Sequence, residues 1–123
     1  MAAEVWVWGA VLLTGTIWGI SSAGLREGAR RSKSAQWRDL LASPLYAFSL
    51  FSNLMGSIAF HLAVASGAGG LSASITQPAV NAVTMSTSCL ADACFDKEAR
   101  VTVLMAAGIT LVVVGVALCA QEA

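Results

Sequence analysis

Ionisable side chains are scarce in this chain, and long stretches of it have none that is positively charged. Among 123 residues there are seven Lys or Arg, seven Asp or Glu and one His, so charged residues make up only 11%. The mean hydropathy is +0.74, well above that of typical soluble domains. Such a balance excludes the basic surface that nucleic acid requires. Four apolar stretches lack Lys and Arg, each with about the ~20 residues a helix needs to cross a bilayer: 5–22, 45–64, 71–94 and 101–120.

The motifs of soluble enzymes and metal sites are also missing. The sequence has no phosphate-binding GxxxxGK[ST] loop, no GxGxxG, no HExxH and no GxSxG elbow, and its three cysteines have no metal-ligand spacing. No Asp or Glu lies within the apolar core of any span, and the single histidine, His61, is near the end of its span. We therefore expect no catalytic residues, no metal and no cofactor, and a protein that is not an enzyme.

The spacing of the apolar stretches predicts an all-α fold, a single membrane domain over residues 1–123 with four transmembrane helices packed as a bundle. All seven Lys and Arg residues fall between spans: five in a basic loop, 25–43, and two in a shorter loop, 92–100. Four spans bring these two loops to one side of the membrane. The positive-inside rule then predicts that both loops are cytoplasmic and that both termini lie on the opposite side.

The basic loop has a second possible role besides fixing topology. Cations next to a membrane are attracted to anionic lipid headgroups by about 1 kcal/mol each. The topological role alone explains the charges, so both interpretations stay open. The residues concerned are Arg26, Arg30, Arg31, Lys33 and Arg38.

A polar stripe runs along the third span. At 100° per residue, Gln77, Asn81, Thr84 and Ser88 fall at about 0°, 40°, −20° and 20°, on one narrow face. An unpaired amide in hydrocarbon costs roughly 2–7 kcal/mol, so we expect the stripe to face other helices or trapped water. Two roles remain: lining the path of a neutral polar solute, or hydrogen bonding between helices.

Further candidates for a substrate path lie on the first two spans. Asn53, Ser57 and His61 recur at every fourth position of the second span, and Trp18 lies on the first. A histidine at such a place acts either as a ligand or proton relay, or only as an interface residue. Pro78, in the middle of the third span, is either a gating hinge or the site of a static kink.

Glycines mark two faces for helix packing. Gly15 and Gly19 form a small-xxx-small pair that allows a neighbouring backbone to approach closely. Gly108 and Gly115 lie seven residues apart in the last span, with Leu111 between them. We expect both faces to form bundle or dimer contacts.

The last span also carries a family resemblance. Its segment GITLVVVGV, residues 108–116, resembles the final helix of small multidrug resistance proteins and related drug/metabolite transporter repeats. The chain is most similar to the transmembrane protein 234 family, through IWGISSAGLREGA (17–29), NLMGS (53–57) and LAVAS (62–66). The resemblance implies a four-helix bundle similar to a half-repeat of the transporter superfamily.

One departure from that superfamily concerns coupling. Small multidrug resistance proteins use a membrane-embedded glutamate in their first helix, whereas the corresponding stretch here, residues 14–18, has no acid. Without a carboxylate that alternates between a proton and a cation, antiport by that route is not expected.

Two functions follow from these patterns. The first is movement of a small solute or lipid. Four helices seldom enclose a path by themselves, so transport requires a homo-oligomer or a partner protein. Because alternating access in this superfamily depends on two inverted units, such a partner would have the opposite topology. The second is a non-transporting scaffold or accessory subunit of a larger membrane complex. In either case the expected partners are the lipid bilayer and another membrane protein or a second copy, not nucleic acid.

Overall fold

The computed structural model describes residues 2–65, 73–95 and 102–121, and within them it is almost entirely helical, without a strand. The all-α class is confirmed. The expected span residues 71, 72 and 101, and most of the second loop with Lys97 and Arg100, lie outside the described residues. The helices are α1 (Ala2–Arg31), α2 (Trp37–Ala42), α3 (Pro44–Ala65), α4 (Ala73–Phe95) and α5 (Val103–Gln121).

Two helix starts follow from local sequence. α3 begins at Pro44, whose ring presets the helical φ angle and whose missing N–H costs nothing in the first turn. The carbonyl of Ser43 accepts the first helical hydrogen bond from the amide of Ala47, at 3.0 Å. At α5, the side chain of Thr102 accepts a hydrogen bond from the amide of Met105 at 3.2 Å, which caps the helix.

The first helix is longer than its apolar stretch. The expectation that it ends near Ser22 and gives way to a loop at residue 25 is wrong, because α1 continues to Arg31. Its last turns carry Glu27, which pairs with Arg30 at 2.7 Å and with Arg31 at 2.6 Å. Such i,i+3 and i,i+4 pairs, together with Arg, Glu and Ala as good helix formers, hold the helix beyond its apolar part.

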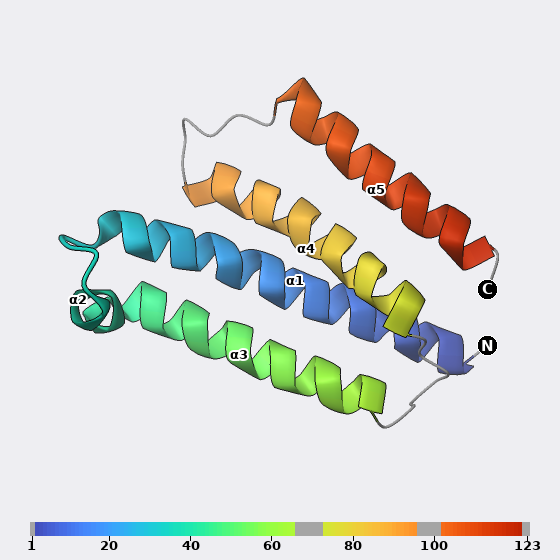
Figure 1. Ribbon diagram of the computed structural model, residues 1–123, viewed down its shortest axis with the longest axis horizontal. Coiled ribbons are helices and arrows are strands. Elements are labelled where there is room, and N and C mark those ends of the chain that lie inside the picture. The colour runs from blue at the N-terminus through green and yellow to red at the C-terminus, as the bar shows by residue number, and fades with distance from the viewer. Residues whose placement is uncertain (1, 66–72, 96–101, 122–123) are drawn as a thin grey trace.

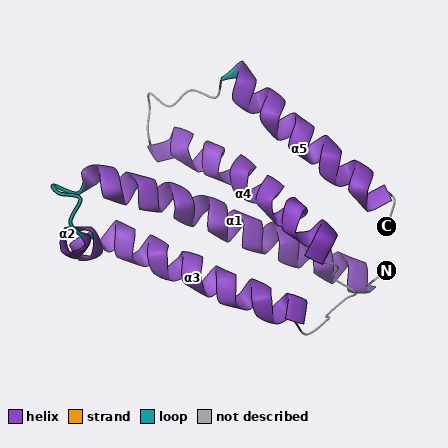
Figure 2. Cartoon of the chain, in the orientation of Figure 1, coloured by secondary structure: helices purple, strands orange, loops and turns teal. Residues whose placement is uncertain are grey.

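The four long helices lie side by side in the order α3, α1, α4, α5, and each runs opposite to the next in the chain (Figure 1). The central position of α1 follows from its contacts, since it packs against α3 on one side and α4 on the other, whereas α5 packs mainly on α4. The beginning of α1 and the end of α5 lie at one end of this row, and the short α2 at the other (Figure 2). A closed four-span bundle stays a prediction.

The buried core is small and lies where α1, α3 and α4 meet. It consists of Val11, Phe60, Ala79 and Val80, with Trp18 packed against it. Many large apolar side chains are exposed, and Val103 and Leu104 of α5 are 86% and 84% exposed. In lipid, unlike in water, exposed apolar surface of this kind has no cost.

Length and composition make two helices candidates for membrane spans: Val5–Arg31 and Pro44–Ala65. The apolar part of α5, Val103–Leu118, is shorter. The Ser, Thr, Asn and Gln content of α4 keeps its hydropathy below that of the two candidates.

Candidate functional site

The seam between α1 and α4 is closed by glycines of α1. A Cβ atom added to Gly15 would lie 2.6 Å from the Cβ of Val83, and one added to Gly19 would lie 2.6 Å from the Cβ of Thr87. Only glycine permits this separation of the two helices. The small-residue pair seen in the sequence therefore faces α4.

At the α2 end of the molecule, this seam carries a charged cluster that joins the two helices. Arg26 Nη2 lies 2.6 Å from Asp92 Oδ2, its Nε lies 3.4 Å from Asp92 Oδ1, and it also donates a hydrogen bond to the hydroxyl of Ser88. The sequence interpretation placed Arg26 and Asp92 in separate loops and missed this contact. Two opposite charges near the ends of two spans that end on the same side were the signal available for it.

The polar stripe of α4 is divided between two environments. Ser88 is buried against α1, and the hydroxyl oxygen of Thr84 is buried without a hydrogen-bond partner among the described residues. Gln77 and Asn81 are exposed, so the expectation that the other helices of the same chain would cover the whole stripe is wrong for these two. Near Gly19, α1 contacts Thr84, Thr87 and Ser88, whereas near Gly15 it contacts Val80 and Val83, so its close contacts reach the stripe only in the part nearest the charged cluster.

The seam between α1 and α3 is also polar. Asn53 Nδ2 donates a hydrogen bond of 3.1 Å to the hydroxyl of Ser21, which itself donates to the carbonyl of Trp18 at 3.2 Å. Ser57 donates to the carbonyl of Asn53 at 3.0 Å, and His61 Nδ1 lies 2.7 Å from the carbonyl of Ser57. Asn53 thus links two helices, whereas Ser57 and His61 bond to the backbone of their own helix.

Trp18 lies in the core where α1 meets α3. Its ring centroid is 5.5 Å from that of Phe60, and its indole nitrogen lies against Gly56, where an added Cβ would be 2.9 Å away. That buried N–H has no acceptor among the described residues. Because buried indole N–H groups normally find a partner, this donor is available to an acceptor that enters the core.

Glu27 is a buried carboxylate that the sequence interpretation placed in a loop. Its side chain is 7% exposed, while those of its partners Arg30 and Arg31 are 55% and 64% exposed. The acid is therefore neutralised at the end of α1 rather than held in the apolar middle of the helix. The positions of Arg30 and Arg31, three and four residues after Glu27, were the sequence signal that predicts these ion pairs on a helix.

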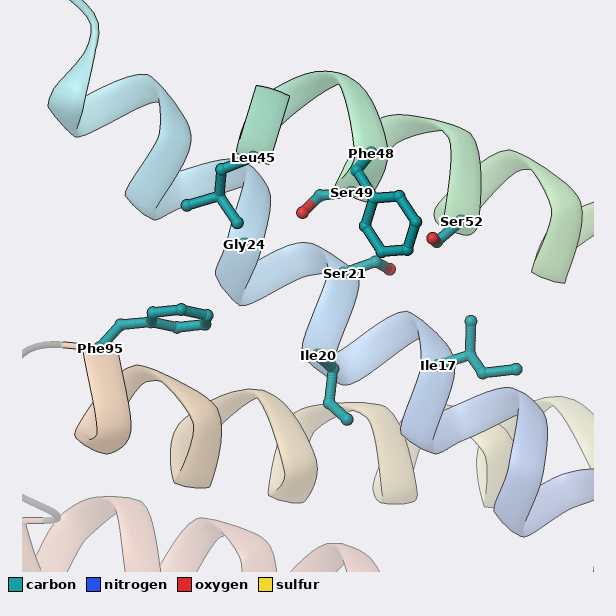
Figure 3. A pocket seen from close by; sticks show the side chains of 9 residues that line it. All are labelled: Ile17, Ile20, Ser21, Gly24, Leu45, Phe48, Ser49, Ser52 and Phe95. Carbon is teal, nitrogen blue, oxygen red and sulfur yellow. The ribbon is translucent and has the colours of Figure 1, made fainter. Parts of the chain in front are cut away.

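A cavity of about 260 Å³ opens beside the seam between α1 and α3. Figure 3 shows that its lining residues come from α1, α3 and the end of α4. Its surface is almost entirely apolar, although three of its lining residues are serines, so it suits a mainly apolar group. Its lining residues are Ile17, Ile20, Ser21, Gly24, Leu45, Phe48, Ser49, Ser52 and Phe95.

A wider hollow of about 360 Å³ lies next to this cavity, between α1 and α4, and shares Ile20 and Phe95 with it. No sequence pattern pointed to either hollow, because residues from three separated helices form them. Among the residues that the structure describes, no group of three His, Cys, Asp or Glu could hold a metal ion.

The remaining predicted residues lie at the periphery. Arg38 stacks over the ring of Trp37 on α2, with the guanidinium carbon 5.3 Å from the centroid, and Lys33 is exposed. Pro78 lies inside α4, which continues helically past it. On α5, Leu111 is exposed, and a Cβ atom added to Gly108 or Gly115 would meet nothing described within 4 Å.

Comparison with known proteins gives one match. The model of a family described as "Putative transmembrane family 234" matches residues 11–120, nearly the whole chain. No curated protein and no solved structure matches. The match supports a membrane protein and does not extend to the drug/metabolite transporters, to which the likeness rests on the sequence motifs alone.

Proposed function

The chain belongs to transmembrane family 234, and from this premise we propose that it is a four-span membrane protein that moves a small amphipathic molecule, a lipid or a solute with an apolar part. The observation that carries this proposal is the mainly apolar cavity between α1 and α3, whose lining includes three serines. The apolar part of such a molecule would lie against Ile20 and Phe48, and its polar atom would lie near Ser52 at the edge of this mainly apolar surface.

The proposed topology has both termini on the non-cytoplasmic side and α2 in the cytoplasmic headgroup region. In its support, Arg26, Arg30, Arg31, Lys33 and Arg38 all lie on the α2 end of the row. The amphipathic character of α2, with Trp37 and Leu41 exposed beside cations, suits the membrane surface.

Cysteine labelling tests this topology. In a background without native cysteines, a thiol reagent that does not cross membranes is applied to oriented vesicles of the Val5→Cys and Ser34→Cys variants. Val5 is at the beginning of α1 and Ser34 follows its end. We expect the two positions to react from opposite sides of the membrane. Reaction of both from the same side would contradict the arrangement.

Transport does not use an embedded glutamate in this proposal. The buried Glu27 is held by two arginines, and the middle of α1 has no acid. The cargo therefore moves down its own gradient or between leaflets, without the proton exchange used by small multidrug resistance proteins.

A lipid-translocation assay tests the transport proposal. The full chain is reconstituted in liposomes with a phosphatidylcholine labelled by nitrobenzoxadiazole, and dithionite is added outside. We expect protein to raise the bleached fraction above one half, and Ser52→Phe, which fills the cavity, to lower the rate. Ile58→Phe, on an exposed face of the same helix outside the cavity, is the matched control. Bleaching equal to that of protein-free liposomes would exclude this lipid as cargo.

A second function is favoured by a different observation. The described side chains of α5 are almost all exposed, and its glycine face is open. A non-transporting subunit that packs against another membrane protein through α5 accounts for this face. Co-purification of a stoichiometric partner that is lost on Gly108→Leu, together with no translocation of any lipid or solute, would support this function over the first.

A further inference from the structure

The exposed amides of α4 point to a second copy of this chain. Gln77 and Asn81 are both exposed, and the only side-chain hydrogen bond that either makes among the described residues joins Gln77 Nε2 to Asn81 Oδ1 at 3.5 Å. Each amide also has donors and an acceptor that this long bond leaves unused. If α4 spans the membrane, as the proposed function holds, these groups lie at lipid depth.

Their depth follows from the length of the helix. The middle of α4 (Ala73–Phe95) is Thr84. At about 1.5 Å per residue, Asn81 lies roughly 4.5 Å and Gln77 roughly 10 Å from this point, both inside a hydrocarbon core of about 30 Å. No water is available there to satisfy an amide. Another protein surface must therefore cover this face.

We propose that the covering surface is the same face of α4 in a second, parallel copy. A primary amide is donor and acceptor at once, so a stripe of two amides is complementary to itself across a two-fold axis. The orientation follows from charge: all described Lys and Arg lie at one end of the helices, so both copies insert the same way. Two parallel copies place Gln77 opposite Gln77 and Asn81 opposite Asn81 at equal depth.

This arrangement accounts for the two amides on the open side of α4. It also creates a polar seam at the two-fold axis that neither copy has alone. The pairing uses α4 and leaves α5 and the cavity between α1 and α3 open to lipid or to other partners.

Disulfide crosslinking tests the face and the orientation. Single cysteines are placed in a background without native cysteines, in membranes containing the full chain, and oxidised. Asn81→Cys and Met85→Cys lie on the proposed face, one turn apart, and Leu90→Cys lies on the opposite exposed face of α4. We expect dimers from the first two and not from the third. Equal or stronger crosslinking of Leu90→Cys, or none at Asn81→Cys, would overturn the proposal.

A second measurement does not depend on introduced cysteines. The dimer dissociation constant in liposomes is obtained from single-molecule photobleaching at several protein-to-lipid ratios. An interhelical hydrogen bond in a membrane is worth a factor of about 2.8 on average, so the loss of four reciprocal amide bonds predicts a rise of the dissociation constant by about sixty-fold for the Q77L/N81L double variant. The control is Thr110→Val on exposed α5, whose hydroxyl is satisfied by the carbonyl of Ala106 at 2.8 Å.

Pairing through the amides would be refuted if the dimer dissociation constant of the double variant were unchanged. It would also be refuted if Thr110→Val raised the dissociation constant as much as the double variant does. A complex that retains one copy of this chain beside a different protein on the amide face would refute the identity of the partner. Neither readout involves cargo. A chain that pairs but translocates nothing leaves this inference intact, and one that translocates as a monomer refutes it while the proposed function stands.

Discussion

Substitution of Gly19 by alanine is the most direct probe of the packing of α1 against α4. The added Cβ would lie 2.6 Å from the Cβ of Thr87, 2.8 Å from the carbonyl oxygen of Thr84 and 2.9 Å from the amide nitrogen of Ser88. Two of these three atoms belong to the backbone, which no rotamer change can move away. The helices must therefore separate, and contacts along the whole seam weaken.

The expected magnitude comes from two opposing effects. Forcing one extra carbon into a tightly packed interface costs about 1–3 kcal/mol. Alanine is favoured over glycine within a helix by up to about 1 kcal/mol, which offsets part of this cost. Gly108→Ala is the matched control, because an added Cβ there meets nothing described within 4 Å and only the propensity gain applies. The free energy of unfolding of Gly19→Ala should thus lie about 1–3 kcal/mol below that of Gly108→Ala.

Unfolding in mixed micelles with increasing sodium dodecyl sulfate measures this difference. Tryptophan fluorescence reports it, since Trp18 is packed in the core one residue before Gly19. If Gly19→Ala were as stable as Gly108→Ala, the close approach of α1 and α4 would be refuted, along with the division of the helices into two seams around α1.

The other predictions concern the polar contacts of the two seams. Asp92→Asn should lower the free energy of unfolding by about 0.2–1 kcal/mol, since Arg26 is 54% exposed and solvent screens the pair, and a double-mutant cycle with Arg26→Gln should give a coupling of that size. Glu27→Gln should cost about 1 kcal/mol in the same assay, because the carboxylate is buried but its arginine partners are more than half exposed, well below the 3–5 kcal/mol of a fully buried pair. Asn53→Leu should lower the free energy of unfolding by about 0.6 kcal/mol, the average value of an interhelical hydrogen bond. In a protein that already carries Ser21→Ala, Asn53→Leu should lower it no further, because the hydrogen bond between the two side chains is already lost.

Much of the fold was readable from local pattern. The four apolar stretches predicted four long helices, and Ser43-Pro44 predicted where α3 begins, because these features depend on neighbouring residues along the chain. The end of α1 was predicted wrongly, since hydropathy does not register the pairs between Glu27 and its arginines that keep charged residues helical. The candidate site was predicted only in part: Asn53 links two helices, but its bonding to Ser21 depends on which helices are neighbours.

What the sequence determined by itself is therefore the class of the protein: long apolar stretches without Lys or Arg indicate a membrane protein, and the Lys and Arg residues between them predict its orientation. Only the tertiary structure decided which side chains are covered. Gln77 and Ser88 lie on one face of a helix by periodicity, yet α1 covers Ser88 and leaves Gln77 open, because α1 meets α4 at Ser88 beside Gly19 but at Val80 and Val83 beside Gly15. The cavity between α1 and α3 and the ion pair of Arg26 with Asp92 likewise depend on contacts between helices that are distant in the chain.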